Sequence, residues 1–180
     1  KSKGNSVNPL DVVDMYGADT LRVYILFIGD YEQATPWNED GVKGARRFLD
    51  KVYRLSENIK ETNDSKAILK ALHQTIEGVS LALESMKFNT AIAKLMTLMN
   101  QFMKEDGISK DTFKTFLQLL NPFAPHLAEE LYSNYGEGLI QLKLWPKADA
   151  SLMKDDTVTL AISINGKVRD TLEVSVDETE

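Results

Sequence analysis

The sequence contains no cysteine and only two histidines, His73 and His126. Without cysteine the chain can form neither a disulfide nor a Cys-ligated zinc site, and thiolate catalysis is excluded. Neither histidine lies in a metal-ligand spacing such as HExxH, so we predict no metal site. No segment approaches the roughly 20 apolar residues that span a bilayer. We therefore expect a cytoplasmic protein without a membrane partner.

The chain also lacks the common sequence signatures of an independent enzyme. It has no glycine-rich phosphate-binding loop, no serine triad and no paired-carboxylate signature. Its net charge of -6 argues against indiscriminate nucleic-acid binding, which needs a broadly positive surface, but leaves room for a local basic stripe. With 43% hydrophobic and 27% charged residues over 180 positions, the composition is that of a folded globular protein.

Two short helices are expected before the first long one. Asn8 and Pro9 provide an N-cap and a first helical residue, and Gly17 provides the C-terminal stop. The second helix is predicted to start at Asp19 as its cap and to end at Gly29. We also expect Asp19 and Arg22 to act architecturally, through an ion pair or a helix-end contact.

Longer helical patterns follow and predict a mainly α fold. Apolar residues recur at three- and four-residue steps over about 38–60, over 65–85, from about 89, and after Ser109 as a cap. The segment NPFAP interrupts this run, and a further helix follows it. Long helices joined by short polar breaks pack as an antiparallel bundle.

The last thirty residues change to the alternating pattern of β-strands. Apolar residues alternate over 158–164 and again over 168–176, with Asn165-Gly166 between them. A two-residue turn there would place the two apolar rows on opposite faces. We therefore predict a three-residue connection with Gly166 in the left-handed region, so that even-numbered positions pair with even-numbered ones.

Several segments together resemble one family. They are KSKGNSVNPLDVVDMYGADTLRVYILF, PWNEDGVKGARRFLDKVYRL, NPFAPHLAEELY and ISINGKVR. In combination they resemble the bacterial-type leucyl-tRNA synthetases, which are class I aminoacyl-tRNA synthetases. The first segment is shared by several class I enzymes, whereas ISINGKVR favours the leucine enzymes over the isoleucyl and valyl types.

The resemblance implies a division of the chain and of the chemistry. Lys1 would be the last lysine of the KMSKS signature, which in the family assists departure of pyrophosphate from ATP. The resemblance then divides the chain into a loop remnant and helical connector (1–36), a tRNA-binding bundle of the anticodon-binding type (37–150) and a truncated β-containing domain (151–180). The catalytic domain would lie upstream, so we expect ATP to serve the full enzyme and the chain alone to lack activation chemistry.

Basic side chains gather on one expected helix, that over about 38–60. They are Lys43, Arg46, Arg47, Lys51 and Arg54. Such a stripe can contact phosphates, and arginine suits bidentate contacts. The alternative is a solvated face held by pairs within the helix, such as Asp50 with Arg54 or Glu39 with Lys43.

The resemblance also bears on function and on two further cations. It implies that the bundle docks along a leucine-accepting tRNA and positions it for ATP-dependent leucylation. It further implies that a complete C-terminal domain contacts the tRNA, which makes Lys167 and Arg169 candidates. Two alternatives stay open: a helical module that binds another protein, and the same region of an isoleucyl- or valyl-type enzyme.

Overall fold

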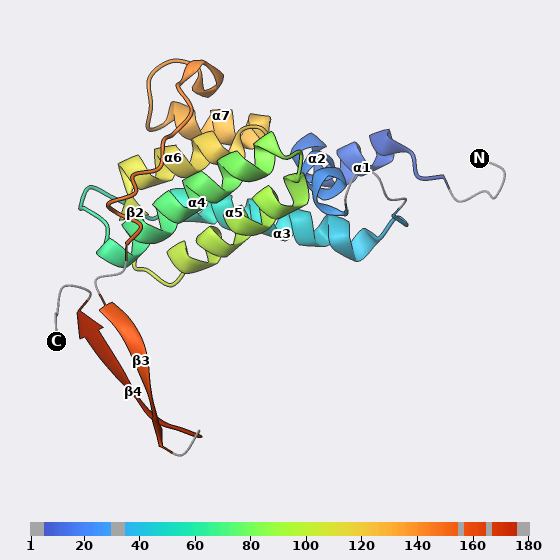
Figure 1. Ribbon diagram of the computed structural model, residues 1–180. Helices are drawn as coiled ribbons and strands as arrows, with labels where there is room; N and C mark the ends of the chain where they lie inside the picture. The colour runs from blue at the N-terminus through green and yellow to red at the C-terminus, as the bar shows by residue number, and fades with distance from the viewer. Residues whose placement is uncertain (1–5, 30–34, 155–156, 165–166, 176–180) are drawn as a thin grey trace.

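The computed structural model describes residues 6–29, 35–154, 157–164 and 167–175, and it is mainly α-helical (Figure 1). Two short helices, α1 (Pro9–Tyr16) and α2 (Ala18–Phe27), precede the long ones. The remaining helices are α3 (Glu39–Ser56), α4 (Lys66–Glu84), α5 (Phe88–Phe102), α6 (Lys110–Leu120) and α7 (Pro125–Ser133), followed by the 3-10 turn η1 (Ile140–Leu142). The predicted mainly α fold is confirmed.

The long helices are amphipathic and enclose one core. Their apolar sides bury a set of large side chains that includes Phe102, Phe113, Phe116 and Phe123. Phe102 and Phe116 meet edge to face with ring centroids 5.6 Å apart. Burying each such side chain contributes roughly 1.5–3 kcal/mol. Within the part of the chain described, no helix is both long enough and apolar enough to cross a membrane.

The start of α1 follows the expected capping chemistry. The side chain of Asn8 accepts a hydrogen bond from the backbone N–H of Leu10, and Pro9 occupies the first turn. The helix stops at Gly17, whose φ of 89° lies in a region that favours glycine. The predicted cap and stop of this helix are therefore confirmed.

Asp19 does not cap α2, so that prediction is wrong. Gly17 occupies the N-cap position, and Asp19 lies buried in the first turn of α2 with 8% of its surface exposed. Its carboxylate instead accepts hydrogen bonds from the backbone N–H of Leu127 at 2.7 Å and of His126 at 3.4 Å, and from Nδ1 of His126 at 2.8 Å. The helix that Asp19 caps is α7, which has no capping side chain of its own.

Arg22 makes the matching contact one turn further along α2. Its Nε and Nη2 donate to the carbonyl oxygen of Pro122 at 3.3 and 3.0 Å. Because this carbonyl lies just beyond the end of α6, Asp19 and Arg22 together attach α2 to the corner between α6 and α7. The expected architectural role of these two residues is confirmed by these contacts.

Two short strands, β1 (Ile59–Lys60) and β2 (Ile108–Ser109), pair in parallel. They link the segment between α3 and α4 to the segment between α5 and α6. Next to them the carboxylate of Asp64 accepts from the backbone N–H and from the hydroxyl of Ser109, at 2.7 and 2.6 Å. The Ser109 hydroxyl also accepts from Thr112 N–H, so the predicted cap of α6 is confirmed.

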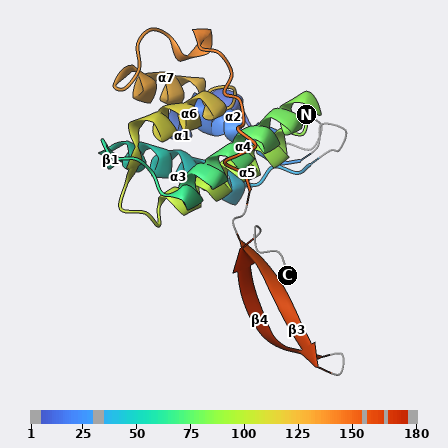
Figure 2. The ribbon, with the colours of Figure 1, turned by 60° about the vertical axis from the view of Figure 1, so that its left-hand side comes forward.

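The C-terminal strands β3 (Thr157–Ile164) and β4 (Lys167–Ser175) form an antiparallel hairpin that extends away from the helices (Figures 1 and 2). Ile164 pairs with Lys167, so residues 165–166 alone connect the strands and the predicted three-residue connection is wrong. Gly166 itself lies outside the described residues.

The even register nevertheless forms, by another route. Ile162 pairs with Asp170 whereas Ser163 pairs with Val168, which leaves Arg169 as the extra residue of a bulge. Beyond the bulge Leu160 faces Leu172, so even-numbered residues pair with even-numbered ones. The apolar residues of the two strands share a face only if even-numbered residues pair with even-numbered ones. The extra residue that makes this possible lies in strand β4 and not in the turn.

The Asp19 contacts yield a stability prediction. Asp19→Ala leaves two N–H groups at the start of α7 without their carboxylate, and we expect a loss of about 2–3 kcal/mol in the free energy of unfolding. Asp14→Ala removes the same charge from an exposed position of α1 and serves as the control, with an expected change within about 0.5 kcal/mol. Urea denaturation measures both, and equal stabilities of the two variants would contradict the assignment.

Candidate nucleic-acid interface on helix α3

Helix α3 buries one side and presents its cations on the other. Asn38 caps the helix through a hydrogen bond from Asp40 N–H. The buried side faces the core and consists of Val42, Ala45, Phe48, Leu49, Val52 and Leu55. Because an α-helix turns about 100° per residue, the five basic residues fall on the remaining arc. The structure thus brings all five predicted cations to one exposed side of one helix.

Arg46 is engaged inside the fold. Its Nε donates to the Asp50 carboxylate at 2.8 Å, and its Nη1 donates to the carbonyl oxygen of Tyr16 at 3.1 Å. Tyr16 is the last residue of α1, so this arginine joins α3 to the N-terminal pair of helices. The contacts give Arg46 an architectural role.

Three further cations have partners of their own. Lys43 lies 3.7 Å from the Asp40 carboxylate, with both side chains exposed. Lys51 donates to the side-chain oxygen of Asn100 on α5 at 3.0 Å, and Arg54 makes a long 3.4 Å contact to the carbonyl oxygen of Asp50. Among the described residues the two pairs named from spacing, Asp50 with Arg54 and Glu39 with Lys43, do not form as ion pairs: Arg46 binds the Asp50 carboxylate and Lys43 lies beside Asp40. Pairing within the helix, as that alternative expected, is nevertheless present with other partners.

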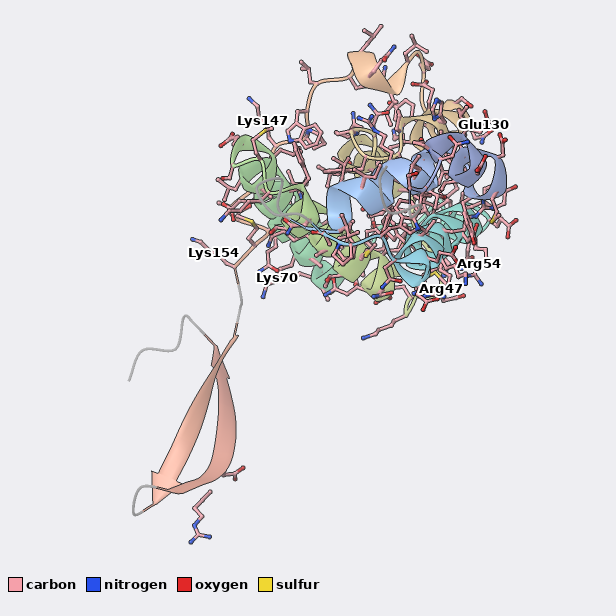
Figure 3. The ribbon with its side chains drawn as sticks, turned by 90° about the vertical axis from the view of Figure 1, so that its right-hand side faces the viewer. Arg47, Arg54, Lys70, Glu130, Lys147 and Lys154 are labelled. Atoms are coloured by element: carbon pink, nitrogen blue, oxygen red, sulfur yellow. The ribbon has the colours of Figure 1, made fainter. Side chains whose placement is uncertain are left out.

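Arg47 is exposed and has no hydrogen-bond or ion-pair partner among the described residues. Arg54 lies seven residues later on nearly the same face. It makes one long hydrogen bond, to the carbonyl oxygen of Asp50 on its own helix. Figure 3 shows these two arginines on the same side of the molecule. On α3, the guanidinium groups most available to an external anion are thus those of Arg47 and Arg54.

The other predicted site residues lie elsewhere. Lys1 is outside the described residues. Lys167 is the first residue of β4, and only its backbone is described. Arg169 is exposed at the bulge of the hairpin. Arg169 therefore lies on the hairpin and not in the cluster on α3.

A groove runs beside the basic face and was not predicted from the sequence. It has a volume of about 560 Å³ and lies between the α1–α2 junction, α3 and the start of α7. Tyr16, Arg46, Tyr53 and His126 are among its lining side chains. The sequence signal for it is weak: Tyr53 follows Arg46 by two helical turns, but no local pattern connects them to His126.

Among the described residues, two carboxyl groups have clearly shifted pKa values, and both belong to loop contacts away from α3. A hydrogen bond from Lys60, aided by its charge, lowers the pKa of Asp106. Hydrogen bonds from the hydroxyl and backbone N–H of Ser151 lower the pKa of Asp149. Their causes are local and structural, so these shifts add no candidate for acid-base chemistry.

Comparison with known proteins identifies the type of domain. The family described as "Anticodon-binding domain of tRNA ligase" matches residues 65–180, more than half of the chain. The chain belongs to the anticodon-binding domain family of tRNA ligases. The expectation of a bundle of the anticodon-binding type is thereby confirmed.

Relatives of this family member also agree with the resemblance to leucyl enzymes. The chain is 45% identical over 181 residues to a leucine–tRNA ligase of Alkaliphilus oremlandii and 44% identical to one of Chlorobaculum parvum. These alignments cover 99% and 96% of the chain but only 23% and 22% of the relatives. The chain therefore spans less than a quarter of the length of the curated relatives that it matches.

A solved structure extends the likeness to the fold. The chain superposes on LeuRS agnB2 of Agrobacterium radiobacter K84, determined as a ternary complex with tRNA and LeuAMS, with a TM-score of 0.83 and 29% identity. The match covers all of this chain and 26% of that one. The predicted likeness to the leucyl enzymes is confirmed by these relatives.

Arg46 has hydrogen-bond partners and the adjacent Arg47 has none among the described residues, which gives a second stability prediction. Arg46→Ala removes the contact between α3 and the end of α1, and we expect it to cost about 1 kcal/mol, because both partners are partly solvated. Arg47→Ala, at the next position, should stay within about 0.5 kcal/mol of the parent chain. Chemical denaturation compares the two, and a larger loss for Arg47→Ala would show that the contacts are wrongly assigned.

Proposed function

We propose that this chain is the tRNA-binding part of a leucine–tRNA ligase and that it positions a leucine-accepting tRNA for ATP-dependent leucylation. The observation that supports the proposal best is the presence of exposed, weakly engaged arginines on α3 of a domain from the anticodon-binding family. The chain's contribution is geometric: holding the body of a substrate fixes the direction of its reacting end.

The charge distribution favours binding of a polyanion at one basic patch over binding across a large part of the surface. A net charge of -6 repels a polyanion from most of the surface, so attraction is confined to places where cations outnumber carboxylates. On α3 the Asp50 carboxylate is already occupied by Arg46, which leaves Arg47 and Arg54 facing solvent. Arginine can contact a phosphate through two parallel N–H groups, which fixes orientation as well as affinity.

The rest of the proposed organisation follows the resemblance. Residues 1–36 are a loop remnant and connector, 37–150 the tRNA-binding bundle, and 151–180 part of a β-containing domain. The bond-forming steps and the use of ATP belong to an upstream catalytic domain, and the protein works in the cytoplasm. Lys1 would act on pyrophosphate only in the presence of that domain, and Lys167 and Arg169 would contact tRNA as part of a larger C-terminal domain.

A charge reversal on α3 tests the proposal. The double variant Arg47→Glu with Arg54→Glu should bind a leucine-accepting tRNA transcript roughly tenfold or more weakly at low salt. It should also reduce the slope of log affinity against log salt concentration by about 2, because two phosphate contacts are lost. Filter binding over a series of salt concentrations measures both quantities.

The matched control reverses two lysines on another side of the molecule. Lys147 and Lys154 are exposed and lie apart from Arg47 and Arg54 in Figure 3. The variant Lys147→Glu with Lys154→Glu makes the same change in net charge and should retain the parent slope. If both double variants lose affinity equally, the effect is that of net charge and the contact on α3 is rejected.

A further inference from the structure

We propose that the groove between Tyr53 and His126 receives one unstacked base of the RNA that α3 binds. This inference rests on the proposed function and adds to it a site for a planar, uncharged group beside the phosphate contacts. The groove volume of about 560 Å³ lies within the range of about 300–1,000 Å³ typical of pockets for small molecules. A single nucleotide is of that size class.

The groove is built from parts of the chain that are far apart in sequence. Its lining includes the short residues Gly17 and Ala18 at the junction of α1 and α2. One wall is the side of α3 that carries Arg46 and Tyr53, and the opposite rim is His126 at the start of α7. The contacts of Asp19 and Arg46 hold these elements together, so the groove is part of the packed fold.

The charges in the groove are paired, which argues for a base and against a phosphate there. Arg46 donates to the Asp50 carboxylate, and Asp50 also lines the groove. The Asp19 carboxylate, which would repel a phosphate, already accepts hydrogen bonds from backbone N–H groups at the start of α7. A phosphate entering this space would meet two carboxylates and one guanidinium that is already engaged. A neutral aromatic ring meets no such penalty.

Tyr53 provides a stacking surface on the groove wall. It is 53% exposed, compared with 39% for Phe27, 38% for Trp145 and 37% for Trp37, the other strongly exposed aromatic residues of the described chain. An exposed ring in the middle of a charged helix face contributes little to the core. Stacking of a base on such a ring is available to every base, because each has a π-face.

The order of residues on α3 places this ring next to Arg47 and the weakly engaged Arg54. Arg46 and Tyr53 are seven residues apart and share the groove side of the helix. Arg47 and Arg54, the residues directly after them, share the adjacent face about 100° further round. One nucleotide can therefore have its phosphate on an arginine of this face while its base turns into the groove.

His126 offers an oriented hydrogen-bonding atom at the rim. Its side chain is 78% exposed, and its Nδ1 lies 2.8 Å from the Asp19 carboxylate. In the tautomer that donates from Nδ1 to this carboxylate, Nε2 carries no proton and is an acceptor. Nε2 can thus accept from the amino group of a base or from a ribose 2′-hydroxyl.

Two substitutions at Tyr53 test the site with the whole 180-residue chain and a transcript of leucine-accepting tRNA. Tyr53→Leu keeps apolar bulk but removes the ring, and it should weaken binding roughly tenfold. Tyr53→Phe keeps the ring and should bind like the parent chain. The salt slope should be the same for all three proteins, because stacking releases no counterions. Circular dichroism and urea denaturation verify that both variants remain folded.

The outcomes separate this site from the phosphate contacts. Reduced affinity of Tyr53→Leu at an unchanged slope, with Tyr53→Phe unaffected, supports the base site. Parent-like binding by Tyr53→Leu overturns it while the proposed function stands. A reduced slope for Tyr53→Leu also overturns it, because the loss is then electrostatic. If the parent chain fails to bind the transcript even at low salt, the proposed function and the base site fall together.

Discussion

The buried carboxylate of Asp19 is the contact on which the arrangement of this molecule depends. It lies on the second helix of the chain and caps a helix that begins more than 100 residues later. Without it, the start of α7 would expose unpaired N–H groups and α2 would lose its main polar attachment to the α6–α7 corner. With Arg22 on Pro122 and Arg46 on Tyr16, the N-terminal helices are fixed to both the end and the middle of the bundle. The groove beside α3 depends on these contacts, because they join the helices that line it.

The same contacts explain which cations remain available for binding. A basic stripe read from sequence treats its members as equal, but their partners in the fold differ. Arg46 holds α1, Lys51 reaches α5 through Asn100, and Arg47 bonds to no other residue in the part of the chain that the structure describes. A side chain whose donors form hydrogen bonds within the protein must break those bonds before it can bind a phosphate through the same donors. The folding contacts therefore select the binding face.

Local rules recovered the helices well, because capping and apolar periodicity act within a few residues. Asn8 and Ser109 are caps as expected, and the long helices lie where their apolar residues recur at helical steps. Asp19 was assigned to the wrong helix because its partners are 107 and 108 residues away, and no local pattern reveals them. In the hairpin, pairing even-numbered with even-numbered residues requires one extra residue. The apolar pattern does not reveal whether that residue lies in a longer turn or, as in the structure, in a bulge at Arg169. The groove was missed for the reason that hid the Asp19 contact, since His126 reaches it only through tertiary packing.

The central claim is that the arginines of α3 that are weakly engaged in the fold, and not Arg46, which holds α1, meet the RNA. Nitrogen-15 NMR of the arginine Nε–Hε groups, recorded while a leucine-accepting tRNA transcript is added, tests this claim residue by residue. The account predicts large changes for Arg47 and Arg54, while Arg22, bonded to the Pro122 carbonyl, stays nearly constant. Signals of Arg47 and Arg54 that remain unchanged in a chain saturated with transcript would contradict it.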